Sequence, residues 1–406
     1  MPDPAPMSTQ HKLALLGGLY LAQGLPYGFF TQAMPVVLRE MGASLGDISL
    51  SSLLLLPWAL KFLWAPLIDR TATRRLWILG LQATAVTLAG LLALANPAGA
   101  GGIRVLLIAV LLTNLVAATQ DIATDGLAVT LLDRDERGLG NGVQVGGYRV
   151  GMILGGGLLL VLFDQLGWAP TLLGMAGLIA LSSLPLLLST SVGQQTAPVR
   201  DALANPWSWV QRAGAVRWAA VLIAFKFGDY LAGSMLRPYL VDAGLSKTQL
   251  GLLLGTGGFV AGLLGAVLGG ALLVRTGRVR ALVLFGLLQA SGVAAYAAVV
   301  ATDATGSGLW AAVIYEHFVG GLATAALFTA MMDASREEHA GTDYTVQASI
   351  VVAAGGAGTA VSGFVAQSIG YPALFAIGAC LALAGPLLAA VPSCTAITRM
   401  DEETLT

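Results

Sequence analysis

Twelve long apolar stretches constrain this chain more than any other feature of its sequence. Each has about the 20 residues that a helix needs to cross roughly 30 Å of hydrocarbon in a bilayer. Backbone groups in lipid must bond to one another, so a span is either a helix or a strand of a closed barrel, and the alternating pattern of barrel strands is missing. We therefore expect an all-α membrane protein with twelve transmembrane helices. The predicted spans are 12–38, 46–68, 76–96, 103–131, 139–164, 168–190, 216–241, 247–273, 280–301, 307–333, 344–367 and 371–392.

The composition supports the same class of protein. Hydrophobic residues make up 56% of the 406 residues and charged residues only 11%, which leaves too little polar surface for a soluble protein of this length. The net charge of −1 gives no reason to expect nucleic acid as a partner. The two cysteines, Cys380 and Cys394, have neither the spacing of metal ligands nor a disulfide framework. We predict no metal site and no cofactor.

Lysine and arginine residues predict the orientation of the chain. With the N-terminus in the cytoplasm, fourteen of the 21 fall on the cytoplasmic side, and only four fall at or near the outer ends of the spans. This bias is typical of cytoplasmic loops. Both termini are therefore expected in the cytoplasm. The first apolar stretch has no small-residue cleavage site and is expected to be a span, not a signal peptide.

The two halves of the sequence repeat each other. Gln144 precedes Gly167 by the same interval that separates Gln347 from Gly370, and two further matches have offsets between 202 and 205 residues. Six helices repeated once, with both termini inside, describe the major facilitator architecture. The predicted domains are an N-terminal six-helix bundle at 1–190, a cytoplasmic linker at 191–215 and a C-terminal six-helix bundle at 216–406.

Several motifs resemble one branch of that superfamily. The turn from Asp69 to Arg75 resembles the superfamily signature between spans two and three, although Val274 stands at the aspartate position in the second copy. The stretches 60–70, 118–126 and 136–152 together resemble the muropeptide permease and acetyl-CoA transporter family. The resemblance implies a secondary active transporter of the bacterial inner membrane.

The choice of substrate within that family depends on resemblance alone. The segment 22–32 and the twelve-span length are similar to the siderophore permeases of the rhizobactin and pyochelin type, whereas enteric muropeptide permeases carry two further C-terminal spans. We therefore expect proton-coupled import of a ferric siderophore from periplasm to cytoplasm. The alternative is an anhydromuropeptide permease, and a remote alternative is a membrane receptor or scaffold without transport.

Ionisable side chains inside the spans of the first half are functional candidates, because a charge in hydrocarbon is costly unless it is paired or hydrated. A rise of about 1.5 Å per residue places Asp121 and Arg149 at matching depth on consecutive spans. We predict that these two side chains pair, and that Lys61 and Asp125 form a second pair nearer the cytoplasm.

The second half carries its own group of charges. Lys226 and Asp229 are three residues apart on one helix face and are expected to neutralise each other. Glu316 has only the neighbouring His317 as an obvious cationic partner. A buried carboxyl without a partner favours its neutral form, because desolvation penalises the charge. We predict that Glu316, together with Asp229, carries the coupling proton; the alternative is that these charges only lock helices together.

Polar residues near the midplane are predicted to line a substrate cavity. Arg149 would bind a carboxylate of the substrate. Glutamines on a membrane helix serve as often to hold helices together, so packing remains an alternative for them. Pro26 beside Gly24 is expected to break span one. The predicted cavity residues are Arg149, Asp121, Lys226, Gln23, Tyr27, Gln32 and Gln144.

Charges near the cytoplasmic face are predicted to form a gate. The members of this gate are Asp69, Arg70, Asp125 and Lys61. For Asp69, Arg70 and Asp125 a structural role, in locking helices or closing the gate, is favoured over contact with the substrate. The arginines of this turn also fit an ordinary positively charged cytoplasmic loop.

Enzymatic activity is not expected. The three histidines lie in different segments without ligand spacing, and no glycine loop ends in the Lys-Ser or Lys-Thr pair that cradles phosphates. The expected partners are a small-molecule substrate, protons and the lipid bilayer, and we expect the protein to act as a monomer.

Overall fold

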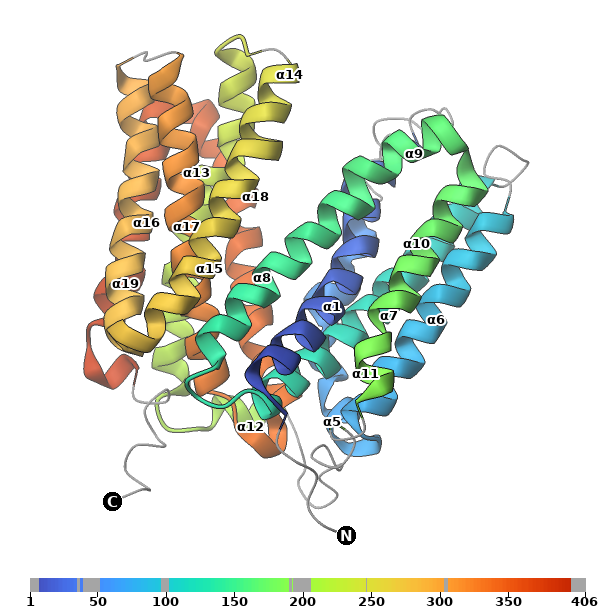
Figure 1. The fold of residues 1–406 in the computed structure, drawn as a ribbon. Helices are drawn as coiled ribbons and strands as arrows, with labels where there is room; N and C mark the ends of the chain where they lie inside the picture. The colour runs from blue at the N-terminus through green and yellow to red at the C-terminus, as the bar shows by residue number, and fades with distance from the viewer. Residues whose placement is uncertain are drawn as a thin grey trace. The chain divides into compact units, whose positions relative to one another are not determined.

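The computed structural model describes residues 7–34, 37–38, 52–95, 102–189, 192, 206–245, 247–302 and 306–395, and these residues form helices joined by short turns, with no strand among them (Figure 1). The first half of the chain contains α1 (Thr9–Gly28), η1 (Phe29–Ala33), η2 (Ser52–Leu55), α4 (Leu56–Leu60), η3 (Lys61–Leu63), α5 (Ala65–Thr71), α6 (Arg74–Leu94), α7 (Gly102–Leu131), α8 (Arg137–Ile153), η4 (Leu154–Leu158), α9 (Leu159–Leu166), α10 (Trp168–Ser182) and α11 (Leu184–Leu188). The second half contains α12 (Pro206–Val210), α13 (Ala215–Asp242), α14 (Lys247–Leu250), η6 (Gly251–Gly258), α15 (Phe259–Thr276), α16 (Arg278–Ala301), α17 (Ser307–Asp333), η7 (Glu337–His339), α18 (Ala340–Ala382), α19 (Ala384–Ala389) and η8 (Pro392–Cys394).

The helices agree with a fold of twelve spans. Ten helical stretches among the described residues are long and apolar enough to cross a membrane. One of them, Glu337–Ala389, contains two spans, because the backbone turns at Gly370. The remaining span is Ser52–Thr71, which is divided into the short helices η2, α4, η3 and α5. The residues before it, 39–51, lie outside the described part of the chain.

The chain folds into two compact units. Unit 1 comprises 1–133, 143–206 and 336–345, and unit 2 comprises 134–142, 207–335 and 346–406. The two short segments are thus grouped with the other half of the chain, and they occupy equivalent positions in the repeat, since 336 − 134 = 202 and 345 − 142 = 203. The predicted boundary at 191–215 remains a prediction, because most of its first fifteen residues lie outside the described part.

Two glycine turns support the internal repeat. Gly167 joins α9 to α10 with a φ of 83°, and Gly370 divides α18 with a φ of 79°. Only glycine adopts this left-handed region without strain. The two positions are 370 − 167 = 203 residues apart, which is the offset that the sequence predicts for the repeat.

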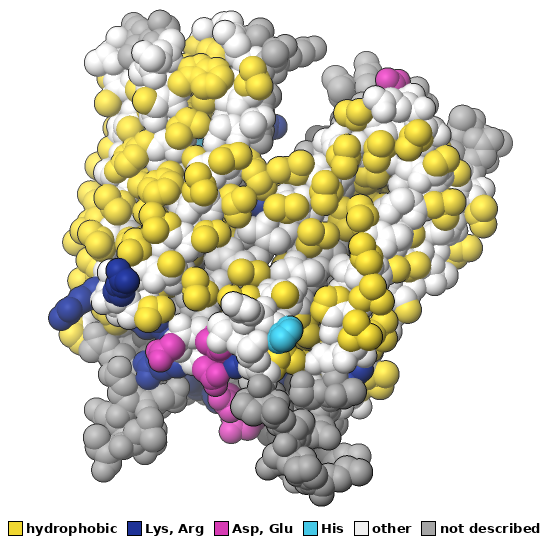
Figure 2. Space-filling model, viewed as in Figure 1, with side chains coloured by type: hydrophobic (Ala, Val, Ile, Leu, Met, Phe, Trp, Pro, Cys, Tyr) yellow, Lys and Arg dark blue, Asp and Glu magenta, His cyan; other side chains and the backbone are white. Residues whose placement is uncertain are grey.

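The outer surface of the helices is apolar. Large hydrophobic side chains are well exposed along many spans, such as Leu94 at 82% and Phe364 at 73%. Figure 2 shows that hydrophobic side chains cover the drawn face of the helices, and that most of the charged side chains on this face lie toward the bottom of the view. An exterior of this kind fits a lipid environment, where the solvent itself is apolar.

Small residues bring helices close together inside each unit. In unit 1, a side chain at Gly24 of α1 would collide with the backbone of Tyr148 and Gly151 of α8. In unit 2, a side chain at Gly265 of α15 would collide with the carbonyl oxygen of Phe318 of α17. Helices in membranes pack through such close approaches, because lipid supplies no hydrophobic force between them.

Span one is continuous through its proline, so the predicted break at Pro26 is wrong. Helix α1 runs from Thr9 to Gly28 with Pro26 inside it, and the turn then widens into the π-helical segment η1. The Phe29 N–H reaches the carbonyl oxygens of both Leu25 and Pro26. Local widening of the helix is one way in which a membrane helix restores the backbone bonds that a proline disturbs.

Each unit has its own apolar core. In unit 1 the core lies between α1, η1, α6, α7 and α10 and includes Leu25, Phe30 and Ile179. In unit 2 it lies between α13, α16, α17 and α18 and includes Tyr296 and Phe375. Within the units, α6 lies beside α7 and α10, and α17 lies beside α15 and α16 (Figure 1).

Candidate functional site

A buried ion pair lies inside unit 1. The Lys61 ammonium binds Oδ2 of Asp121, and the two side chains are 4% and 11% exposed. Lys61 belongs to the 3₁₀ turn η3, and Asp121 belongs to α7. The spans two and four thus meet through a charge pair that is largely withdrawn from water.

This pair corrects the predicted partner of Lys61, which was expected to bind Asp125. The predicted pair of Arg149 with Asp121 stays a prediction. Lys61 lies ten residues before the end of α5 and Asp121 lies ten residues before the end of α7, so the two are at the same depth. The predicted end of span two at residue 68 placed Lys61 too close to the cytoplasm, since α5 continues to Thr71.

Asp125 has neutral partners. Its Oδ1 atom accepts hydrogen bonds from the Tyr20 hydroxyl at 2.9 Å and from Nε2 of Gln144 at 3.2 Å. Asp121 lies one helical turn away on α7, so the two carboxyl groups share one face of that helix. Asp125 is 2% exposed. The pair of carboxyl groups therefore connects α1, η3, α7 and α8.

Three aromatic rings gather beside the ion pair. The ring centroids of Tyr27 and Trp58 are 5.5 Å apart, and Tyr148 lies 5.5 Å from Tyr27 and 6.4 Å from Trp58. The Lys61 ammonium lies 5.7 Å from the Trp58 ring centroid, within the range of a cation–π interaction. The indole N–H of Trp58 donates to the side chain of Asn114 at 3.2 Å. Tyr27, predicted as a cavity residue, is thus half-buried beside the charged cluster.

The other predicted cavity residues of the first half differ in their surroundings. Gln23 is 1% exposed, and neither atom of its amide has a hydrogen-bond partner among the residues that the structure describes. Arg149 is half-buried on α8. The side chain of Gln32 lies outside the described part of the chain. Gln144 on α8 donates to Asp125 on α7 and so links these two helices.

Unit 2 contains the predicted pair of Lys226 and Asp229. The ammonium lies 3.3 Å from Oδ2 of Asp229 on the same helix, which confirms the prediction. The ammonium also donates to the Thr324 hydroxyl at 3.1 Å. Asp229 in turn lies close enough to Glu316 to interact with it electrostatically.

Glu316 has one partner that the sequence predicted and one that it did not. Its Oε2 atom accepts a hydrogen bond from the Tyr296 hydroxyl at 2.6 Å and lies 3.1 Å from Nδ1 of His317. The same Nδ1 atom lies 2.9 Å from the carbonyl oxygen of Val313. Because both neighbours of Nδ1 are acceptors, this nitrogen carries a hydrogen. His317 is therefore the neighbour that the sequence predicted for Glu316, and Tyr296 is a further, neutral partner that it did not predict.

Asp69 is the centre of a polar cluster at one end of unit 1. It binds Arg74 at 3.2 Å, and its other oxygen accepts from the backbone N–H and the hydroxyl of Thr342 at 2.8 and 2.7 Å. Asp343, which follows Thr342 in the sequence, accepts a hydrogen bond from the Arg336 guanidinium at 2.8 Å. This bonding raises the pKa of the Arg336 guanidinium and keeps it charged. Arg70, predicted for the same gate, is half-buried.

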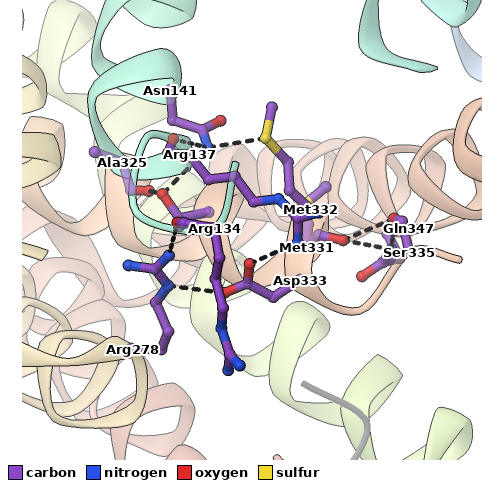
Figure 3. A network of polar contacts seen from close by, with 11 residues as sticks. Arg134, Arg137, Asn141, Arg278, Ala325, Met331, Met332, Asp333, Ser335 and Gln347 are labelled. Atoms are coloured by element: carbon purple, nitrogen blue, oxygen red, sulfur yellow. Dashed lines mark hydrogen bonds and ion pairs between the residues drawn. The ribbon is translucent and has the colours of Figure 1, made fainter. Parts of the chain in front are cut away.

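Asp333 is the corresponding centre in unit 2. It lies between two arginines, with Oδ1 3.0 Å from Arg137 and Oδ2 2.8 Å from Arg278 (Figure 3). Arg278 also donates to the carbonyl oxygen of Arg134. The second copy of the signature has Val274 in place of an aspartate, and Asp333 of α17 supplies the carboxylate that binds the arginine of that copy.

Asp333, Thr342 and the tyrosines that bind carboxylates were not predicted from the sequence. Asp333 ends a predicted span and follows His317 by sixteen residues with no other acid between them, so its position opposite two arginine-bearing loops was an available signal. Tyr20 and Tyr296 carry no such signal, because a tyrosine in an apolar helix packs in a core far more often than it binds a carboxylate. Among the described residues, no group of three His, Cys, Asp or Glu side chains could hold a metal ion.

Comparison with known proteins gives one family. The family model of the Major Facilitator Superfamily matches residues 16–359. The anhydromuropeptide permease of Escherichia coli K12 is 27% identical over 401 residues, which cover 93% of this chain and 79% of that protein. An uncharacterized protein of Haemophilus influenzae is 30% identical over 385 residues, which cover 90% of each.

Solved structures show the same fold. The fucose:proton symporter of E. coli matches with a TM-score of 0.72 at 15% identity and covers 95% of this chain and 99% of its own. A bacterial homologue of the iron transporter ferroportin, in its outward-facing state with soaked iron, matches with a TM-score of 0.67 at 16% identity, over 94% of this chain and 98% of its own. At these identities the likeness concerns the fold alone.

Proposed function

The chain belongs to the major facilitator superfamily, and on that premise we propose that it imports an anhydromuropeptide across the bacterial inner membrane together with protons. The observation that carries this proposal is the similarity to an anhydromuropeptide permease over 93% of the chain. The siderophore expectation depended on one segment and on the number of spans, so it now takes second place. The protein acts as a monomer with both termini in the cytoplasm.

The charges in the two units support transport of a carboxylate-bearing solute. Arg149 is half-buried on α8, next in sequence to Tyr148 of the aromatic cluster. An arginine in this position binds a carboxylate through two parallel hydrogen bonds. The rings of Tyr27, Trp58 and Tyr148 offer flat apolar faces to the sugar portion of the same molecule. In unit 2, Lys226 provides a second cation for an anionic group.

Glu316 and Asp229 are the proposed carriers of the coupling proton. Both carboxyl groups are inside a span and close enough to feel each other's charge, while one lysine, Lys226, is bound to Asp229. His317 contributes a second cation only when it is protonated. Two ionised carboxyl groups beside one permanent cation leave a net charge of about −1 in the site. Binding of one proton to either carboxyl group neutralises that charge.

The gate residues take a structural role in this proposal. Asp69 holds Arg74 and Thr342 together in unit 1, and Asp333 holds Arg137 and Arg278 together in unit 2. Opening a path for the substrate would separate such bonds on one side of the membrane. Lys61 and Asp125, also predicted for the gate, lie in the buried cluster around Asp121.

Ligand-dependent thermal stability tests the substrate. A ligand that binds only the folded protein stabilises it by about 2.7 kcal/mol at a hundred times its Kd. We expect the purified protein to be stabilised by an anhydromuropeptide, and not by a ferric siderophore or acetyl-CoA at the same concentration. Stabilisation by the siderophore alone would reverse the order of the two candidates. A protein that binds but shows no flux would be a receptor.

A further inference from the structure

Three arginines of unit 2 have no acceptor in the part of the protein that the structure describes. Arg217, Arg275 and Arg280 are exposed, and no hydrogen bond or ion pair joins them to another described residue. Arg278, which lies between two of them in the sequence, differs because it binds Asp333. Both oxygens of that carboxylate are already in ion pairs. The three exposed arginines therefore carry positive charge that no acid of unit 2 is placed to neutralise.

Arg275 and Arg280 lie on either side of one tight turn. Helix α15 ends at Thr276 and α16 begins at Arg278, so Gly277 alone joins them, with a φ of 77°. Arg275 is in the last turn of α15 and Arg280 is in the first turn of α16. The two arginines therefore belong to the same end of unit 2.

Arg217 on α13 lies at a similar level. A side chain at Gly286 of α16 would meet the ring of Phe225 of α13 at 2.9 Å, so the two helices are adjacent at that height. Arg217 precedes Phe225 by eight residues and Arg280 precedes Gly286 by six. At 1.5 Å per residue these intervals are about 12 and 9 Å. Spans seven and nine run in the same direction, because span eight returns between them. Arg217 therefore adds a third cation at this end.

An apolar stripe leads to the arginine at the end of each helix of this hairpin. The exposed positions recur at intervals of four and three residues, which places them on one face of a helix. They are Leu284, Leu287, Ser291 and Ala294 on α16, after Arg280, and Val260, Leu264, Val267, Ala271 and Val274 on α15, before Arg275. In a bilayer, exposed faces of this composition contact acyl chains.

We propose that Arg217, Arg275 and Arg280 bind the phosphate head group of an anionic phospholipid, whose acyl chains lie along the two stripes. A guanidinium group donates hydrogen bonds in a fork that matches phosphate oxygens, and basic pockets between spans hold lipid head groups of this kind. A free phosphate ion would leave the stripes to other lipids. A zwitterionic lipid brings its own cation, which three arginines repel. The inference does not depend on the solute that the protein transports.

Native mass spectrometry of the detergent-solubilised protein, titrated with phosphatidylglycerol, measures the Kd of the lipid complex. Phosphatidylcholine with the same acyl chains is the comparison, because it has the same phosphate but adds a quaternary ammonium group. We expect phosphatidylglycerol to bind the wild-type protein at least about fivefold more tightly. Equal Kd values for the two lipids would overturn the proposal, since the acyl chains alone would then account for binding.

Variants assign the site. Arg217→Gln, Arg275→Gln and Arg280→Gln are each expected to raise the Kd for phosphatidylglycerol by about fivefold and to leave that for phosphatidylcholine unchanged. Arg237→Gln is the matched control, because Arg237 is exposed near the other end of α13 and also has no partner among the described residues. It removes the same charge and should leave both Kd values unchanged. Equal effects of Arg237→Gln and Arg280→Gln would show a response to net charge, which contradicts a site.

Inorganic phosphate distinguishes a lipid site from a site for a soluble anion. At millimolar concentration it should not displace phosphatidylglycerol from the wild-type protein, because the ion makes no contact with the apolar stripes. Displacement would show that the arginines bind the phosphate group alone and would overturn the lipid assignment. Failure of the proposed transport function would look different, since loss of anhydromuropeptide uptake leaves every one of these lipid Kd values as it is.

Discussion

Lys61 and Lys12 each bind one aspartate in unit 1, but the two aspartates differ in exposure. Asp121, the partner of Lys61, is 11% exposed, whereas Asp133, the partner of Lys12, is 81% exposed. Removing one member of a buried pair leaves a charge without water or partner, whereas an exposed aspartate is solvated either way. The Lys61–Asp121 pair should therefore contribute more to the free energy of unfolding than the Lys12–Asp133 pair.

Lys61→Met is expected to lower the free energy of unfolding by about 3 kcal/mol, and Lys12→Met by less than about 1 kcal/mol. The two changes are chemically identical, so the second is a matched control for the first. Thermal unfolding in detergent, followed at the same pH and salt for both variants, measures the difference. Equal losses for the two variants would show that the buried pair is not the stabilising contact.

Glu316→Gln is expected to abolish the pH dependence of uptake while leaving the protein folded, because the amide keeps an acceptor for Tyr296 but cannot carry a proton. Uptake as a function of external pH measures this. Glu337→Gln, a change at an exposed position of η7, serves as the control and should retain the wild-type profile. Uptake with an unchanged pH profile in Glu316→Gln would exclude this carboxyl group from coupling.

Sequence alone predicted many of these side chains but fewer of their partners. The Lys226–Asp229 pair was predictable because three residues on one helix fix the distance between two side chains. Lys61 and Asp121 come from different spans, so their pairing depends on where each helix ends. An error of three residues at the end of span two was enough to assign Lys61 to the wrong aspartate.

At the scale of helices, close packing depends on glycines that face a neighbouring backbone. Gly265→Ala is expected to destabilise unit 2 by about 1–3 kcal/mol, because the added Cβ would collide with the carbonyl oxygen of Phe318 and force α15 from α17. Gly80→Ala on α6 is the control, since nothing lies within 4 Å of the added atom. There the higher helix propensity of alanine should leave stability unchanged or raised.

Thermal unfolding of the Gly265→Ala and Gly80→Ala variants measures these changes in stability. A lower melting temperature for Gly265→Ala only is the expected result. Equal melting temperatures would mean that α15 and α17 can move apart without cost.

Asp333 joins α17 to two segments that carry arginines, so its neutralisation should loosen one end of unit 2. Asp333→Asn is expected to cost about 3 kcal/mol, because Arg137 and Arg278 both lose a charged partner. Asp242→Asn, at an exposed aspartate that accepts from Tyr371, is the control and should cost less than about 1 kcal/mol. Similar losses of thermal stability in the two variants would show that Asp333 is not a structural centre.

The elements themselves were largely predictable, because span length and apolar character follow directly from the thickness of a bilayer. Predicted span 307–333 coincides with α17, and 103–131 differs from α7 by one residue. Span two is the exception. Pro57 and Pro66 each lie near the start of a short helix, and a hydropathy pattern contains no information on such divisions.

For the whole molecule, the internal repeat is the most informative sequence feature. The offset of 203 residues returns in the two left-handed glycines, Gly167 and Gly370. The repeat did not reveal that 134–142 and 336–345 are each grouped with the other half of the chain. Such an exchange depends on tertiary packing, which a comparison of the halves with each other does not contain.

Substrate identity is the other question at this scale. The resemblance of one segment favoured a siderophore, whereas similarity over 93% of the chain favours an anhydromuropeptide. The second comparison rests on far more positions than the eleven residues of the segment 22–32.

Transport by the purified protein in lipid vesicles tests the central claim most directly. Vesicles with a neutral interior are placed in an acidic medium that contains a radiolabelled anhydromuropeptide, with an equal set supplied with a ferric siderophore. The account predicts accumulation of the anhydromuropeptide that collapses when the proton gradient is dissipated. Accumulation of the siderophore instead, or uptake that does not respond to the proton gradient, would contradict it.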